Sequence, residues 1–322
     1  MDEFTLINKI KQSSYRQSSL LKGVGDDAAV FRMSQGDLVT ATDVFVENVH
    51  FSRKTMNPKQ IGYRALAVNF SDLAAMGAEP MFYLVSIVVP ERWKQEIQSI
   101  FMGMDELASE YQADLIGGDT VSGEDLMISI NVIGRVDQGR ARYRHEAKPG
   151  DLVFVTGTLG DSRAGLHILQ SDQKYEQADY FIKRHRYPTP RIHFSLGLRD
   201  IDRIALNDIS DGIVSEAAEI AEASEVNLIL EEESLPVSKA FEQFTEKERV
   251  DWKLYGGEDF ELLAVTAEEN WASIKDIAKE TDTRVTRIGY VEALEEESKD
   301  RLYLVKKGKR QPISKRGYRH LT

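Results

Sequence analysis

The sequence predicts an α/β protein with mixed sheets, divided into two domains. Its 322 residues are 42 per cent hydrophobic and include eight prolines, which is enough for two ordinary domains with separate cores. Strand-like and helix-like segments alternate along both halves of the chain. Between the halves, residues 137–150 are polar, rich in arginine and end near a Lys-Pro-Gly-Asp turn. We therefore expect one domain over residues 1–137 and a second over residues 138–322.

The first half is expected to combine helices and strands. Asn57 and Pro58 predict the start of a long helix, because asparagine caps a first turn and proline fits the first helical position. Gly77 predicts its end. The other elements that periodicity predicts here are helices over 2–12 and about 93–111, and strands over 27–31, 37–43, 81–89, 113–118 and 126–136.

The second half repeats this mixed character. Apolar runs predict strands over 152–157 and 203–207. A helix is expected to open at Asp211, and strands and helices then alternate to about residue 306. Helices are also predicted near 162–170, 175–185 and 190–199.

Composition excludes several classes of function. The chain has no cysteine, which rules out disulfides, thiolate zinc sites and cysteine nucleophiles. A net charge of −12 disfavours nucleic acid and anionic lipid as partners. The acidic amino terminus does not resemble a secretory signal, and the longest strongly apolar run, residues 81–89, is too short to span a membrane. We expect a cytoplasmic protein.

Carboxylates recur where predicted strands end. The segments that carry them are VGDD (24–27), TATD (40–43), IGGD (116–119), NDISD (207–211) and YGGED (255–259), and Asp72 adds an acid from the long helix. A single aspartate after glycine is commonly a turn former. Five converging segments would repel one another unless cations neutralised them. Mg²⁺ prefers oxygen ligands and is often completed by substrate phosphates, so the pattern predicts magnesium sites.

Phosphate binding has one candidate in the linker. Arg140, Arg142 and Arg144 lie two apart, so an extended segment would project all three from one face and could clamp phosphate oxygens. The alternative is a solvated linker. Gly23, Gly25 and Ala28 match a dinucleotide fingerprint, but a strand-like segment follows them where that motif requires a helix. Walker A and protein-kinase signatures are absent from the sequence.

Several motifs resemble, in order, those of the thiamine-monophosphate kinase family. They are GVGDDAAV, TATDVFVENVHF, ALAVNFSDLAAMGAEP, LIGGDT, KPGDLVFVTGTLGDSRAGL, DISDG and GGEDFELL, and they span almost the whole chain. This family belongs to the aminoimidazole ribonucleotide synthetase, or PurM-like, superfamily. The resemblance implies ATP-dependent phosphorylation of thiamine monophosphate to thiamine diphosphate with several Mg²⁺ ions. It also implies a homodimer in which the amino-terminal domains form a barrel-like interface.

The resemblance also implies roles for individual residues. Catalysis would depend on Asp43, Asp72 and Asp119, which organise metals, and on Arg144, which steadies the donor phosphates. Ala41 stands where relatives often carry a hydroxyl residue, which loosens one metal site if that hydroxyl is a ligand. The implied metal ligands are Asp27, Thr42, Asp43, Asp72, Asp119, Asp208 and Asp211; the ATP contacts are Tyr111, Gly118, Asp119, Arg144 and Ser210; the thiamine monophosphate contacts are His50, Glu258 and Tyr318.

Direct in-line transfer fits such a site. The acceptor is a phosphomonoester whose second pKa lies near 6, so its oxygen needs no general base at neutral pH. Phosphoryl transfer demands mainly positioning and charge stabilisation. Three structural alternatives remain open at this point: His50 as an ordinary strand residue, Tyr318 as a packed terminal residue and each isolated aspartate as a turn former. Two functional alternatives also remain: a superfamily member acting on an amide or selenide, and a non-catalytic Mg²⁺-nucleotide sensor.

Overall fold

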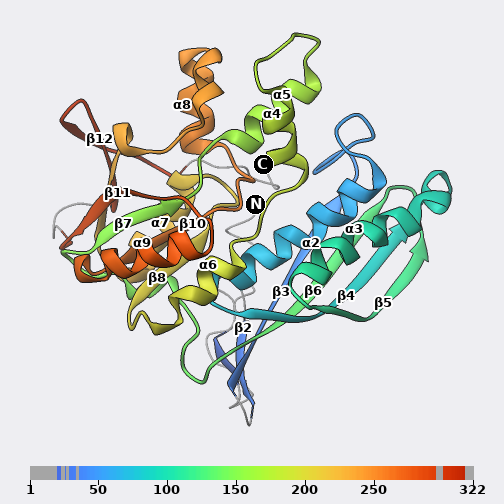
Figure 1. Ribbon diagram of the computed structural model, residues 1–322, viewed down its shortest axis with the longest axis horizontal. Helices are drawn as coiled ribbons and strands as arrows, with labels where there is room; N and C mark the ends of the chain where they lie inside the picture. The colour runs from blue at the N-terminus through green and yellow to red at the C-terminus, as the bar shows by residue number, and fades with distance from the viewer. Residues whose placement is uncertain (1–19, 23–25, 27–28, 34–35, 295–299, 316–322) are drawn as a thin grey trace.

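Two sheets organise the chain. The computed structural model describes residues 20–22, 26, 29–33, 36–294 and 300–315. The first sheet has strand order β1-β2-β3-β6-β4-β5, and the second has order β13-β12-β9-β11-β7-β10-β8 (Figure 1). Both sheets mix parallel and antiparallel pairs. The predicted α/β class with mixed sheets is confirmed; the predicted domain boundary falls between the two sheets and stays a prediction.

The first sheet and its helices come from residues 20–136. Its strands are β1 (Leu20–Lys22), β2 (Ala29–Met33), β3 (Gly36–Val46), β4 (Glu79–Val89), β5 (Asp114–Ser122) and β6 (Met127–Val136). Helices α2 (Pro58–Ala75) and α3 (Ile97–Glu110) cover one face of this sheet, as Figure 1 shows. The predicted helix over 93–111 is divided, because a 3₁₀ turn over Glu91–Glu96 precedes α3. The predicted helix over 2–12 lies outside the described residues.

The second sheet follows a short 3₁₀ turn over Arg144–Glu146. Its strands are β7 (Leu152–Thr156), β8 (Ile204–Asp208), β9 (Asn227–Glu231), β10 (Leu262–Thr266), β11 (Val285–Glu292), β12 (Leu302–Lys306) and β13 (Lys309–Pro312). The α-helices of this half are α4 (Asp161–Gln170), α5 (Ala178–Arg186), α6 (Ile192–Gly197), α7 (Ile213–Ser224), α8 (Glu246–Tyr255) and α9 (Trp271–Glu280). The predicted helices and strands of this half are therefore confirmed within a few residues.

Helix α2 begins as predicted and joins the two halves. Asn57 accepts a hydrogen bond from the Gln60 backbone at 3.0 Å, and the Gln60 side chain accepts one from the Asn57 backbone at 2.9 Å. The helix packs against the first sheet and α3, and also against α6 and β8 of the second half. Most of its residues are buried, including the polar side chains of Arg64, Asn69 and Ser71. A helix buried on nearly every side can present polar groups to both halves.

No helix in the described part of the chain is both long and apolar enough to cross a membrane. The cytoplasmic location expected from the sequence stays a prediction.

Helices α2 and α3 cross at two glycines, and this contact yields a stability prediction. A Cβ atom on Gly62 would overlap the backbone of Ile100, and one on Gly103 would overlap the backbone of Lys59. Alanine is normally better than glycine inside a helix by about 1 kcal/mol, but here the clash decides the sign. We expect Gly62→Ala to lower the free energy of unfolding by about 1–3 kcal/mol in urea titrations.

Gly117→Ala is the matched control for this measurement. A Cβ atom at Gly117 would meet only the Leu84 side chain, at an ordinary 3.6 Å. We expect the free energy of unfolding to change by less than about 0.5 kcal/mol in this variant. Equal unfolding curves for Gly62→Ala and the wild-type chain would show that the helices can separate at no cost, contrary to this description.

Candidate active site

The carboxyl-terminal half of α2 gathers three of the predicted acids. The side chain of Asn69 accepts a hydrogen bond from the Asp43 backbone at 3.0 Å. Asn69 and Asp72 are three residues apart and therefore share a face of the helix. Between them, Ser71 donates a hydrogen bond of 2.6 Å to Asp208, which ends β8 in the second half. Asp43, Asp72 and Asp208 thus come from different elements that contact or belong to the same half of one helix.

Four carboxylates beside this point form what we call the acidic cluster: Asp208, Asp211, Glu216 and Glu219. Glu216, on α7, accepts hydrogen bonds from the Asn207 side chain at 2.8 Å and from the Asp211 backbone at 3.0 Å. Helix α7 therefore fixes the loop that carries the predicted metal ligands. Burial raises the pKa of Glu216 well above its usual range, and the neighbouring carboxylates of the cluster raise it further.

Arg144 lies against the acidic cluster. Its guanidinium is 3.3 Å from the Asn207 side-chain oxygen and 3.3 Å from Glu219, and its backbone N–H donates to Asp26 at 3.2 Å. Lys315 contacts the same Glu219 carboxylate at 2.6 Å, so the carboxyl-terminal end of the described chain also reaches the cluster. Two basic side chains therefore partly balance the negative charge.

The expected common face of three arginines is wrong. Arg142 is buried and donates to the carbonyl of Leu198 at 2.6 Å, whereas Arg140 is exposed and lies 3.4 Å from Asp202. Residues 137–147 form turns and a 3₁₀ segment, and such a backbone does not keep the two-residue period of a strand. Of the three arginines, Arg144 alone is shown against the acidic cluster.

The backbone of Glu258 holds this residue next to the loop that carries Ser210 and Asp211. Its N–H donates to the Ser210 carbonyl at 2.6 Å, and its φ of 68° is in the left-handed region that few non-glycine residues adopt. The Glu258 carboxylate points instead to Arg64 of α2, with 2.8 Å between Oε1 and Nη2. The predicted nucleotide contact Ser210 and the predicted substrate contact Glu258 are therefore neighbours.

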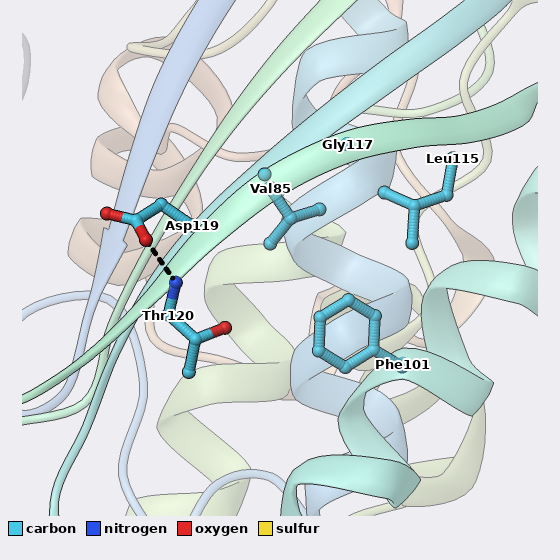
Figure 2. Close-up of a pocket in the computed structure, with 7 residues that line it drawn as sticks. Val85, Phe101, Leu115, Gly117, Asp119 and Thr120 are labelled. Atoms are coloured by element: carbon cyan, nitrogen blue, oxygen red, sulfur yellow. Dashed lines mark hydrogen bonds between the residues drawn. The ribbon is translucent and has the colours of Figure 1, made fainter.

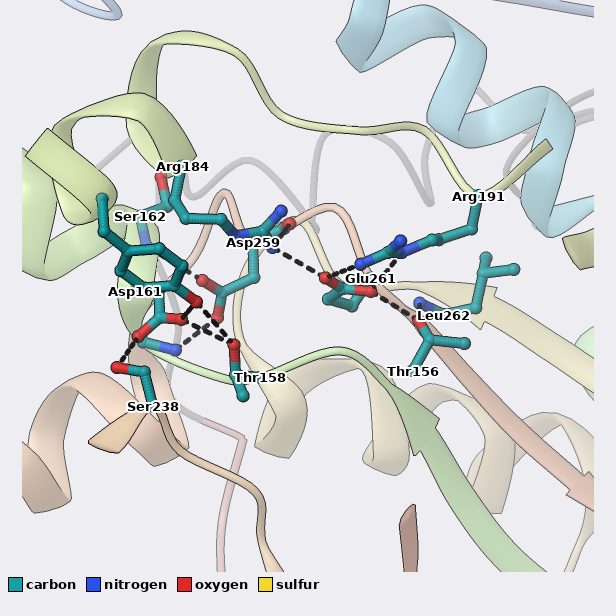
Figure 3. Close-up of polar contacts among 12 residues, drawn as sticks. Thr156, Thr158, Asp161, Ser162, Arg184, Arg191, Ser238, Asp259, Glu261 and Leu262 are labelled. Atoms are coloured by element: carbon teal, nitrogen blue, oxygen red, sulfur yellow. Dashed lines mark hydrogen bonds and ion pairs between the residues drawn. The ribbon is translucent and has the colours of Figure 1, made fainter. Parts of the chain in front are cut away.

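The other acids of the GGEDFE segment have structural partners (Figure 3). Asp259 accepts the backbone N–H groups of Gly160 and Ser162 at the start of α4, at 2.6 and 3.2 Å, and burial raises its pKa to about 8. Glu261 is 1 per cent exposed and binds Arg191 through two contacts of 2.6 Å and Arg184 through one of 2.7 Å. Burial alone would raise the pKa of Glu261, but the two arginines lower it.

Asp119 lies apart from these groups, which corrects the expectation of one convergent metal site within the chain. Asp43 of β3 pairs with Ile130 of β6, Ile130 with Val85 of β4, and Val85 with Gly118 of β5. These three strand spacings put Asp43 and Gly118 about 14 Å apart. Asp119 is next along β5, so its side chain projects from the opposite face to that of Asp43. A cavity of about 380 Å³ beside β5 is lined in part by Gly118, Asp119 and Phe101 (Figure 2).

The remaining predicted residues are spread more widely. The Thr42 hydroxyl donates to the Ile130 carbonyl at 2.9 Å, on the face opposite Asp43. His50 is half-buried, stacks on Phe45 and accepts the Val46 N–H on Nδ1 at 3.0 Å. Tyr111 is buried and donates to the Pro190 carbonyl at 3.0 Å, which is a packing role; its contact with nucleotide stays a prediction. Ala41 is buried within the sheet. Asp27 and Tyr318 lie outside the described residues.

Carboxylates dominate the donor set near α2. Oxygen donors without cysteine or histidine suit Mg²⁺ better than zinc or copper. Within the described residues, however, no three histidine, aspartate or glutamate side chains stand close enough together to hold a metal ion as they are. The composition of the site fits Mg²⁺, and ligands from bound phosphates would have to complete its coordination.

Sequence reasoning missed three residues that build this site: Arg64, Ser71 and Glu216. Each acts on a residue distant in the chain or on a neighbouring loop, so local spacing gives little signal. Ser71 directly precedes the predicted ligand Asp72, which is the one hint that the sequence contains.

Comparisons with known proteins identify the family. Two family models match, "AIR synthase related protein, N-terminal domain" over residues 25–136 and "AIR synthase related protein, C-terminal domain" over residues 148–300. The chain is 42% identical to a thiamine-monophosphate kinase of Bacillus subtilis over 99% of both chains.

Solved structures agree with this match. A structure described as "AaThiL complexed with AMPPCP and TMP" superposes with a TM-score of 0.85 at 31% identity, covering 99% of this chain and 97% of that chain. A thiamine-monophosphate kinase of Stenotrophomonas maltophilia has a TM-score of 0.77 at 34% identity, covering 94% and 96% of the two chains. The chain with two mixed sheets joined by α2 therefore belongs to the thiamine-monophosphate kinase family.

Proposed function

We propose that this chain transfers the γ-phosphoryl group of ATP to the phosphate of thiamine monophosphate, which yields thiamine diphosphate and ADP. Membership of the kinase family supports the reaction, as does the solved relative that was complexed with AMPPCP and TMP. The observation that carries the proposal is the arrangement along α2. Ser71 contacts the acidic cluster and Arg64 contacts Glu258, and these two helix residues are about 10 Å apart along the axis.

This spacing suits the two chemically different ends of the proposed substrate. Asp43 and Asp72, together with Asp208 and Asp211, would hold Mg²⁺, which supplies charge neutralisation between two polyanions when bound. Glu258 would lie beside the positively charged ring portion, and His50, whose Nδ1 accepts the Val46 N–H, would contact the same substrate. Tyr318 completes the proposed substrate contacts.

Nucleotide would be bound on the side of the acidic cluster where Arg144 lies. Arg144 is oriented by Asn207 and Glu219, so its guanidinium is held in place before phosphate arrives. Ser210 is the further proposed nucleotide contact at this cluster, and Asp27 the further proposed metal ligand. The roles that the resemblance implies for Gly118, Asp119, Tyr111 and Thr42 stay predictions, because Asp119 projects from the opposite face of the sheet to Asp43, and Thr42 and Tyr111 donate to backbone carbonyls. In the transfer, an acceptor-phosphate oxygen bonds to the γ-phosphorus while the bond from that phosphorus to the β,γ-bridging oxygen breaks. ADP leaves, and no phosphoenzyme forms.

We also propose a homodimer formed through the first sheet. Strand β5 is an edge strand, and the exposed fractions of its Leu115, Ile116 and Val121 are 45, 51 and 49 per cent. Val44 of β3 is 44 per cent exposed on the face of the same sheet that α2 and α3 do not cover. Exposed aliphatic residues on an open sheet favour a protein partner, and a second copy would cover them.

The first prediction from the proposed function concerns product formation. Incubation of the chain with MgATP and thiamine monophosphate should give equal amounts of thiamine diphosphate and ADP on chromatography. EDTA should abolish both products and added Mg²⁺ should restore them. ATP hydrolysis without thiamine diphosphate would contradict the proposal. A trapped labelled phosphoenzyme, or net retention at a chiral γ-phosphorus, would contradict direct transfer.

The second prediction concerns Asp72. We expect Asp72→Asn to lower kcat at least 100-fold, because a metal bridge contributes several kcal/mol to the transition state. Its melting temperature should stay within a few degrees of the wild-type value. Asp276→Asn is the control and should keep full activity, because Asp276 forms only an exposed ion pair with Lys279, one turn away on α9. Full activity in Asp72→Asn would give this acid a structural role instead.

The third prediction concerns assembly. Light scattering should give twice the chain mass of 36.4 kDa for the wild-type protein. Val121→Glu should shift the protein towards monomer, because a buried unpaired charge is costly at an interface. Asp276→Asn again serves as the control. A monomeric wild-type chain, or a Val121→Glu variant that stays fully dimeric, would contradict this interface.

A further inference from the structure

Arg64 is a buried cation whose role the reaction chemistry leaves unexplained. Its side chain is 0 per cent exposed, although it lies on a helix where the two halves meet. Within the described part of the chain, its Nε, Nη1 and Nη2 atoms are buried without a hydrogen-bond partner. The Nη2 atom nevertheless lies 2.8 Å from Glu258 Oε1, so the contact is an ion pair without hydrogen-bond geometry.

Glu258 is the carboxylate that balances this charge. Among the described residues, no other acid lies within ion-pair distance of Arg64. Burial and the positive charges of Arg64, Arg186 and Arg163 together hold the pKa of the neighbouring His185 far below its usual range. The Phe260 ring, centred 5.6 Å from the guanidinium carbon, offers only a weak additional attraction. A buried charge is strongly unfavourable without its partner, so Arg64 constrains where Glu258 can point.

The backbone of Glu258 is constrained from the other side. The positive φ values of Glu258 and Phe260, 68° and 50°, are strained for residues with side chains. The Ser210 and Ile209 carbonyls hold these two N–H groups at 2.6 and 3.0 Å. The Glu258 side chain is 33 per cent exposed, and its Oε2 makes no hydrogen bond to other described residues. One carboxylate oxygen is thus held by Arg64 while the other remains available to a ligand.

We propose that Arg64 is a positioning residue for thiamine monophosphate: it orients the Glu258 carboxylate so that Oε2 accepts a hydrogen bond or cationic contact from the substrate. This inference rests on the proposed function. It adds a residue that does not touch substrate but sets the substrate affinity. Because Arg64 acts through Glu258, its loss should affect thiamine monophosphate and leave ATP binding unchanged.

Steady-state kinetics on the full chain tests the inference. We expect Arg64→Met to raise KM for thiamine monophosphate at least 10-fold while KM for ATP stays within twofold of the wild-type value. Arg64→Lys keeps the charge and should have an intermediate KM. The double variant Arg64→Met with Glu258→Gln should raise KM for thiamine monophosphate no further than the more damaging of the two single changes does, because both changes remove the same contact. Arg135→Met, which breaks an exposed pair with Glu79, is the matched control and should match the wild type.

The outcomes separate this inference from the proposed function. A wild-type chain that makes no thiamine diphosphate overturns both. A productive wild-type chain with an unchanged thiamine monophosphate KM in Arg64→Met overturns the role of Arg64 alone, as does an equal rise in both KM values. If Arg64→Met melts below the assay temperature, Arg64→Lys carries the test: an unchanged thiamine monophosphate KM, or an equal rise in both KM values, then overturns the inference.

Discussion

The contact between α2 and two loops of the second half is the constraint on which the site depends. Ser71 donates a hydrogen bond to Asp208 and Arg64 forms an ion pair with Glu258, and both side chains are buried on one helix of the first half. A helix is a rigid element, so these two contacts fix the separation and the relative direction of the loops that carry them. Without α2, Asp43 of β3 and Asp208 of β8 would lack the shared helix that both contact.

Acidic residues serve two purposes in this chain, and their surroundings distinguish them. Asp259 and Glu261 are buried with backbone N–H groups or arginines satisfying their oxygens, so they connect segments of the second half. In the acidic cluster, Glu216 and Glu219 are also bound, but burial and the charges of three neighbouring carboxylates raise the pKa of Glu216, whereas the raised pKa of Asp259 comes chiefly from burial. Excess negative charge that the protein does not neutralise is what a cation site requires. The folded chain thereby keeps charge imbalance where polyanionic ligands are proposed to meet.

The sequence predicted the local structure well, and predicted long-range contacts poorly. Capping residues at Asn57 and Pro58 located α2, because capping is chemistry between close neighbours. The acids near α2 were found from predicted strand ends, which is correct for Asp208 at the end of β8, whereas Asp43 lies within β3, which runs on to Val46. The common face of three arginines was wrong because residues 137–147 turn instead of extending. Asp119 was predicted to follow a strand that ends at residue 118, but β5 runs on to Ser122, so Asp119 lies within the strand. Register places Asp119 away from Asp43, and register depends on pairing that no local pattern encodes. Arg64 was missed because its partner Glu258 is distant in the chain. Glu216 was missed because its contacts with Asn207 and Asp211 form only when the loop between β8 and α7 folds.

A crystal structure with Mg²⁺, AMPPCP and thiamine monophosphate bound would test most directly whether the residues around α2 form one binding site for the metal and the substrate. The arrangement predicts metal density between Asp43, Asp72 and Asp208, with the rings of thiamine monophosphate beside Glu258 and the guanidinium of Arg64 still behind it. Thiamine monophosphate bound instead in the cavity beside β5, with the surroundings of α2 free of ligand, would contradict the account.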